Sequence, residues 1–127
     1  MKKQTPLFIA LFLFTPFLMT AQSIVGDWLM DGKTPDGQTV VNKVSFNADG
    51  TLAVDFGNDG SIDVNATYTV DGNKISMKDT SKESPCYGTV GIYEIKIEGN
   101  KCTAKVVEDA CAVRKGDGKP GTMTRAK

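Results

Sequence analysis

The sequence predicts an all-β domain that folds as a small antiparallel up-and-down barrel of eight strands. Apolar and polar residues alternate in several runs, the longest of which spans residues 62–70. This period of two is typical of a strand with one buried face. Asp-Gly and Gly-Asn pairs, which suit tight hairpin turns, separate the runs. No sustained apolar stripe with helical spacing interrupts them.

The eight expected strands follow one another at short intervals. They cover residues 24–30, 38–46, 51–56, 62–70, 74–79, 88–97, 101–107 and 120–125. Short connections favour hairpins between neighbouring strands and leave little room for crossovers. Such a meander hides its edge strands by closing into a barrel. A two-sheet β-sandwich is the alternative, which the evenly spaced hairpins disfavour.

The first 21 residues have the order of a secretory signal peptide. Lys2 and Lys3 precede an apolar run over residues 7–14, and Ala21 is a small residue before the expected cleavage. A retained membrane anchor is the alternative, but the run is shorter than the ~20 residues that span a bilayer. No cysteine lies near the cleavage site for lipid attachment. We therefore expect residues 22–127 to form one secreted or periplasmic domain, with no membrane span after cleavage.

The composition limits the classes of function. The chain has 127 residues, with 15 basic residues, 15 acidic residues and no histidine. The lack of histidine excludes Ser-His-Asp and Cys-His catalysis and removes the commonest zinc ligand. The balanced charge argues against a nucleic-acid binder, which needs a basic surface. We expect a protein that is not an enzyme and has no cofactor, no metal site and no nucleic-acid partner.

The start of the first strand carries a recognisable motif. Gly26–Asp27–Trp28 resembles the Gly-x-Trp signature of the lipocalin and calycin barrels. The resemblance to small bacterial lipocalin-like domains extends over most of residues 24–125. Segments similar to the hairpins of those domains are 46–51, 68–75, 91–93 and 108–114.

Barrel topology places the start of the first strand beside the end of the eighth. Trp28 and Arg125 are therefore expected to meet. The resemblance implies that the tryptophan closes the barrel floor and that a basic side chain near the C-terminus lies across its ring. A guanidinium over an indole contributes about 0.5–2 kcal/mol. We expect Gly26, Trp28 and Arg125 to form this floor as a structural feature.

Three cysteines allow one disulfide in an exported protein. Cys86 and Cys111 lie in the loops after the fifth and seventh strands, which emerge at the same end of a meander. Cys102 begins the seventh strand at the other end, up to ~30 Å of extended chain away from Cys111. Because a disulfide needs Cα atoms about 4.4–6.8 Å apart, the sequence predicts a Cys86–Cys111 bridge. Cys102 is then a buried thiol without a catalytic role.

The acidic segment 55–63 invites comparison with a calcium loop. When Gly60 takes the sixth position of an EF-hand loop, Gly57 falls at the third and Ala66 at the twelfth. Two ligating side chains are then missing. The Asp59–Gly60 pair instead favours a hairpin turn.

Bulky apolar residues are expected to face the barrel interior from nearly every strand. They are Val40, Val44, Phe46, Leu52, Val54, Phe56, Ile62, Val64, Tyr68, Val70, Ile75, Met77, Tyr93 and Ile95. Small eight-stranded barrels hold either packed side chains or one small ligand. This composition favours a mostly filled core with a modest apolar pocket near the mouth. Tyr68, Met77 and Tyr93 are the expected lining residues.

Two functional hypotheses remain open. The first is an exported domain that binds a small hydrophobic or amphipathic molecule. The second is an envelope or extracellular protein-interaction module with a filled barrel core, which contacts its protein partner through the loops at the bridged end. The volume and lining of the barrel interior distinguish the two.

Overall fold

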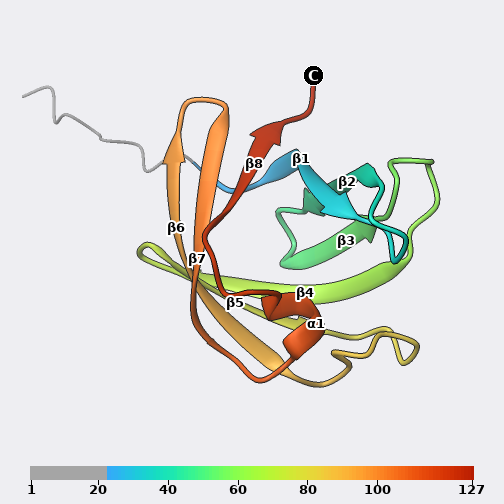
Figure 1. The fold of residues 1–127 in the computed structure, drawn as a ribbon. Helices are drawn as coiled ribbons and strands as arrows, with labels where there is room; N and C mark the ends of the chain where they lie inside the picture. The colour runs from blue at the N-terminus through green and yellow to red at the C-terminus, as the bar shows by residue number, and fades with distance from the viewer. Residues whose placement is uncertain (1–22) are drawn as a thin grey trace, which may run out of the picture.

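Eight antiparallel strands pair in chain order and close into a barrel, with β8 returning to β1 (Figure 1). The computed structural model describes residues 23–127. The strands are β1 (Gly26–Lys33), β2 (Thr39–Phe46), β3 (Thr51–Asp55), β4 (Val64–Asp71), β5 (Lys74–Asp79), β6 (Val90–Glu98), β7 (Lys101–Asp109) and β8 (Gly121–Arg125). The predicted up-and-down barrel is confirmed, and the sandwich is not the fold. The predicted signal peptide lies outside the described residues.

Most differences from the expected strands lie at their ends. β1 extends to Lys33 because its last residues pair with the start of β2, as in the pair of Gly32 with Val40. A short helix, α1 (Ala112–Lys115), was not expected. Its four residues are too few to produce a recognisable helical period in the sequence.

Inward and outward side chains alternate along the strands as expected, with three exceptions. Phe56 and Ile62 are about half exposed, at 53% and 50%, because β3 ends at Asp55 and β4 begins at Val64. The alternation therefore stops before these residues, and both lie in the intervening loop. Val70 is also exposed, close to the β4–β5 turn. None of the three fills the barrel interior.

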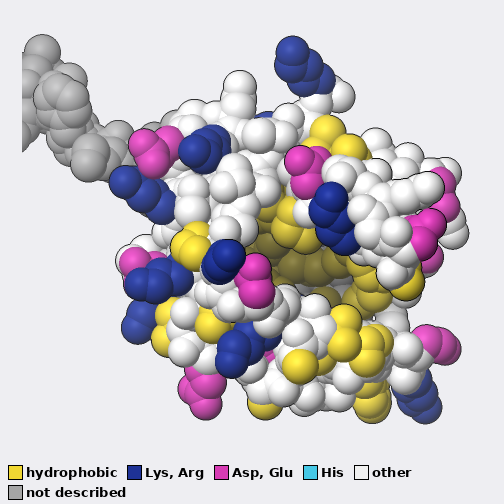
Figure 2. Space-filling model, in the orientation of Figure 1, with side chains coloured by type: hydrophobic (Ala, Val, Ile, Leu, Met, Phe, Trp, Pro, Cys, Tyr) yellow, Lys and Arg dark blue, Asp and Glu magenta, His cyan; other side chains and the backbone are white. Residues whose placement is uncertain are grey.

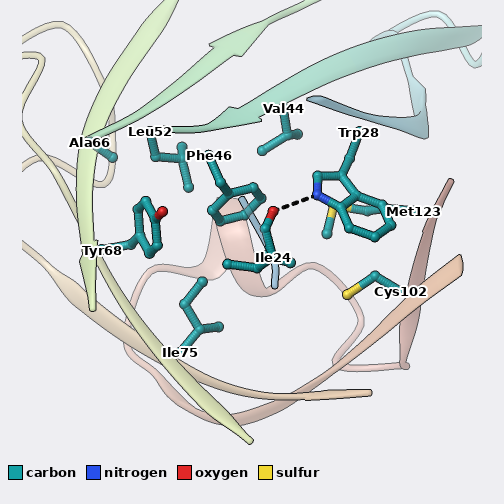
Figure 3. Close-up of a cluster of buried hydrophobic side chains, with 10 residues drawn as sticks. All are labelled: Ile24, Trp28, Val44, Phe46, Leu52, Ala66, Tyr68, Ile75, Cys102 and Met123. Atoms are coloured by element: carbon teal, nitrogen blue, oxygen red, sulfur yellow. Dashed lines mark hydrogen bonds between the residues drawn. The ribbon is translucent and has the colours of Figure 1, made fainter. Parts of the chain in front are cut away.

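The barrel core gathers around Trp28, which is fully buried (Figure 3). Its indole Nε1 donates a hydrogen bond to the carbonyl oxygen of Ile24, at 2.8 Å. Phe46 and Tyr68 meet edge to face, with ring centroids 5.1 Å apart. The other buried members of this cluster are Val44, Leu52, Ala66, Ile75, Cys102 and Met123.

Arg125 caps the tryptophan from the last strand. Its guanidinium carbon lies 4.2 Å from the centre of the Trp28 ring, and its Nη2 donates to the carbonyl oxygen of Ser23, at 2.7 Å. Gly26 has a φ of +131°, and a Cβ there would lie 3.1 Å from Arg125 Nη1. Arg125 therefore lies against both of the other residues expected at the floor, Trp28 and Gly26. We call this the closed end of the barrel.

Candidate functional site

At the opposite end of the barrel, the strands do not form a continuous wall. β8 pairs with β1 only over Trp28–Met30 and with β7 only over Lys101–Ala104. The last residues of β1 and β7 extend past β8, so the wall is interrupted there. Figure 2 shows a hollow on this face, between the β1–β2 hairpin and α1, with hydrophobic atoms at its base. We call this the open end.

Partly buried apolar side chains line the inner wall between the two ends. Met30, Val54, Met77 and Tyr93 pack against the core cluster without being fully buried. Two of the three predicted lining residues, Met77 and Tyr93, belong to this group. Tyr68 does not, because it is 8% exposed and packs on Phe46 within the core. Its hydroxyl donates to the carbonyl oxygen of Asn47 in the β2–β3 turn, at 2.6 Å.

A polar cluster of Asp79, Tyr93, Asp109 and Arg114 occupies one side of the open end. Arg114, from α1, donates two hydrogen bonds to Asp109, from Nε at 2.6 Å and from Nη2 at 2.8 Å. Its Nη1 contacts Asp79 Oδ1 at 3.2 Å, and the Tyr93 hydroxyl donates to Asp109. A side chain at Gly91 would collide with both Asp109 and Arg114, because its Cβ would lie 2.6 Å from the carboxylate.

The contacts within the cluster shift the pKa values of Asp109, Arg114 and Tyr93. Burial raises the pKa of Asp109, but hydrogen bonds from Arg114, Tyr93 and the Cys111 amide outweigh it and hold the pKa below its ordinary value. The hydrogen bond to Asp109 raises the pKa of Arg114. Burial and the neighbouring Asp109 carboxylate raise the pKa of Tyr93. At neutral pH Asp109 is thus a carboxylate paired with the Arg114 guanidinium, and Tyr93 keeps its proton.

The predicted Cys86–Cys111 disulfide is confirmed and lies beside this cluster, with Cα atoms 5.5 Å apart. The Cys111 amide donates to Asp109 Oδ1 at 2.9 Å. Ser84, in the loop that carries Cys86, donates from Oγ to Asp79 Oδ2 at 2.5 Å. The bridge and the ion pairs therefore hold the β5–β6 and β7–β8 loops together.

The polar groups of this cluster hold the β5–β6 and β7–β8 loops together. Among residues 23–127, no buried side-chain nitrogen or oxygen lacks a hydrogen-bond partner. Asp109 and Arg114 satisfy each other, which leaves neither free to act as a base or to receive an anion. Cys102 is free and buried near the closed end, where burial raises the pKa of its thiol. A raised pKa keeps a thiol unreactive.

Sequence reasoning did not identify this cluster. Neither Arg114 nor Asp109 was expected to take part in an ion pair. One sequence feature could have indicated the cluster. Asp79 lies at the same alternate positions of β5 as Ile75 and Met77, which places it on the inward side of the strand. Sequence reasoning also overlooked Asn42, a polar residue among the inward apolar residues of β2. Asn42 is 8% exposed, and its Oδ1 accepts a hydrogen bond from the Gly57 amide at 3.0 Å.

Segment 56–63 forms the predicted connection between β3 and β4. It brings Asp55, Asp59 and Asp63 together, with carboxylate oxygens within 4.8 Å of one another. Carboxylate oxygens are ligands that hard cations prefer. Each carboxylate already accepts a backbone N–H of this loop, as Asp55 does from Asp59 and Gly60. Burial raises the pKa of Asp55, but these amides outweigh it and the pKa is lowered.

A shallow groove of about 270 Å³ lies on the outer wall of the barrel, where β1, β2 and β8 meet. Its lining residues point away from the interior. They are Leu29, Asp31, Val41, Thr122 and Thr124. The groove is therefore separate from the hollow at the open end.

No protein-family model matches the sequence, and no curated protein matches it. Within residues 23–127, no helix has the length and apolar character needed to cross a membrane. The fold is compatible with that of the lipocalins, an eight-stranded antiparallel up-and-down barrel.

Proposed function

We propose that this chain is an exported lipocalin-like domain that binds a small hydrophobic or amphipathic molecule at its open end, without catalysing a reaction. The observation that carries the proposal is the contrast between the sealed floor and the hollow with an apolar base. A barrel closed at one end and lined by apolar side chains at the other is a typical ligand-binding arrangement. The Cys86–Cys111 bridge supports export, since disulfides persist in oxidising compartments.

The half-buried side chains provide the apolar contact. Met30, Val54 and Met77 lie on three different strands and pack against one core. Their remaining exposed surface is apolar, and covering it with a ligand contributes about 25 cal/mol per Å². Methionine side chains adapt to irregular ligand shapes.

A ligand panel with matched variants tests this proposal. The purified protein is titrated with straight-chain lipids and apolar dyes, and thermal unfolding is followed. A ligand at about 100 times its Kd stabilises the fold by about 2.7 kcal/mol. Met30→Trp fills the hollow and is expected to weaken binding at least tenfold. Val41→Trp places the same bulk on the outer wall, where Val41 is 40% exposed, and leaves binding unchanged.

Three outcomes have different meanings. Loss of binding only in Met30→Trp supports the open end as the site. Loss only in Val41→Trp moves the site to the outer groove. Absence of stabilisation by every ligand overturns the proposal.

A protein-interaction module is the second candidate, favoured by two exposed apolar side chains on the bridged loops. Val113 is 73% exposed and Tyr87 is 52% exposed, and each lies next to or near a cysteine of the disulfide. In this alternative, replacing loop 108–119 abolishes capture of a protein partner while the barrel still folds. Capture that is indifferent to this replacement contradicts it.

A further inference from the structure

We infer that buried side chains partway along the barrel, Ile75 among them, form a floor beneath the hollow and limit the apolar part of a bound molecule to a short chain. This inference rests on the proposed function and adds a size class to it. The ligand is then a molecule with a short alkyl or acyl group, and the floor residues determine its length.

Burial falls in the same way along each odd-numbered strand. These strands run from the closed end to the open end. In each of them a buried inward side chain is followed, two residues along, by an inward side chain that is only partly buried. The pairs are Trp28 and Met30 in β1, Leu52 and Val54 in β3, Ile75 and Met77 in β5, and Cys102 and Ala104 in β7. The boundary between filled core and hollow is thus repeated on four strands.

The side chains below this boundary are closely packed. Trp28 and Cys102 are 0% exposed, and Ile75 is 1% exposed. Figure 3 shows these side chains pointing into the same space as the rings of Phe46 and Tyr68. A ligand chain would reach this layer only by displacing side chains, which a close-packed interior resists.

The height of the partly buried wall sets the length of chain that it covers. Inward positions recur every two residues, which is about 6.6 Å along a strand. One partly buried inward residue, Val54, follows the boundary in β3, and two, Ala104 and Val106, follow it in β7. The wall is therefore about 7–13 Å tall, measured along the strands. Because carbon–carbon bonds of about 1.5 Å advance an extended chain by roughly 1.3 Å each, this wall covers roughly five to ten carbons.

Above the wall, the inward side chains become charged. Asp79 follows Met77 on the inward face of β5, and Asp109 ends β7. Both carboxylates are paired with Arg114. A longer chain would place its extra carbons beside these charged groups and water, where they gain no further apolar contact.

A series of straight-chain primary alcohols, from butanol to tetradecanol, tests the limit. Binding is followed by NMR titration of the methyl groups of Met30 and Met77, with the buried Met123 for comparison. Each buried methylene raises the affinity about fourfold. The affinity should rise at this rate with chain length and level off between about five and ten carbons. A rise at the same rate up to tetradecanol would overturn the inference.

Two variants move the floor in opposite directions. Ile75→Ala removes carbons from the floor and should lengthen the limit by about three carbons, because the cavity left behind accommodates them. Ala104→Leu adds carbons above the floor and should shorten the limit by about three carbons, because it fills space that the chain would occupy.

Each variant has a matched control. Ile24→Ala makes the same truncation at the closed end, where the Ile24 side chain is 4% exposed and its carbonyl oxygen accepts the Trp28 hydrogen bond. Ala53→Leu makes the same addition on the outward face of β3. Both controls should leave the limit unchanged. A control that moves the limit as far as its matched variant would contradict the position of the floor.

The outcomes separate this inference from the proposed function. If no alcohol binds at the open end, both are overturned. If the alcohols bind but neither Ile75→Ala nor Ala104→Leu moves the limit, the floor is wrong while ligand binding stands. Should Ile75→Ala fail to fold, Ala104→Leu decides the question, because it leaves the buried core cluster unchanged.

Discussion

The closed and open ends of the barrel are built from the same strands but are stabilised by different interactions. At the closed end, Trp28 is fully buried beneath Arg125 and packs against the apolar core. At the open end, a disulfide and the Arg114 ion pairs hold the loops to one side, and the apolar wall is only half covered. Cross-links fix the loops without filling the space between them, which is what a binding site at this end requires.

The largest expected effect concerns the floor. Trp28→Ala removes the centre of the core and should lower the free energy of unfolding by about 3–5 kcal/mol. Val54→Ala at the half-buried wall should cost about 1 kcal/mol. Urea unfolding of both variants measures the difference. Equal losses would mean that the two ends do not differ in packing.

Removal of the disulfide should loosen the open end more than the closed end. Replacing Cys86 and Cys111 together by serine should lower the free energy of unfolding by about 3 kcal/mol, since the bridge closes a loop of 25 residues. The lost stability should speed exchange of amides that open only by global unfolding, such as those around Trp28, and the β5–β6 and β7–β8 loops should in addition open locally. Uniform loss of protection across both ends would contradict this separation.

The polar cluster makes the free energy of unfolding depend on pH. The lowered pKa of Asp109 means that the unfolded chain binds this proton more readily than the folded one. The resulting stabilisation is present above about pH 4 and is lost as pH falls through and below that value. Asp109→Asn should therefore cost about 2 kcal/mol at pH 7 and flatten the decline in stability at low pH. Unfolding measured between pH 3 and pH 7 checks this, and an unchanged slope would contradict it.

The smallest expected effect concerns the close approach of Arg125 to Gly26 at the barrel floor. Gly26→Ala places a Cβ 3.1 Å from Arg125 Nη1 in a residue with a φ of +131°, at an expected cost of about 1–2 kcal/mol. Gly121→Ala is the control at the other end of β8, where a Cβ meets nothing within 4 Å. Thermal unfolding compares them. A cost in Gly121→Ala as large as that in Gly26→Ala would show that the contact with Arg125 is unimportant.

Much of the architecture was predictable because its signals are local. Alternation located every strand, and Asp-Gly turns separated them, as between β4 and β5 at Asp71–Gly72. The disulfide followed from topology, since loops after odd-numbered strands share one end. The misplaced side chains, Phe56 and Ile62, lie where alternation continues in the sequence after the strand has ended.

The candidate site was less predictable because it depends on contacts between distant segments. The spacing of Asp79 and Arg114, 35 residues apart, carries no signal of their ion pair. Tyr68 has the parity expected of a lining residue, but the β2–β3 turn provides its hydroxyl partner and keeps it in the core. Asn42 is distinguished only once the Gly57 amide and Gly32 are placed around it.

The amino-acid sequence alone thus specifies the strands, their order and the cysteines that meet, because alternation, turn residues and hairpin topology are local properties. Only the tertiary structure decides that β8 pairs with part of each neighbouring strand and that α1 brings Arg114 to Asp79 and Asp109. These contacts join residues that are far apart in the sequence, 35 residues for Asp79 and Arg114 and about 100 for β1 and β8, and no local pattern encodes their packing.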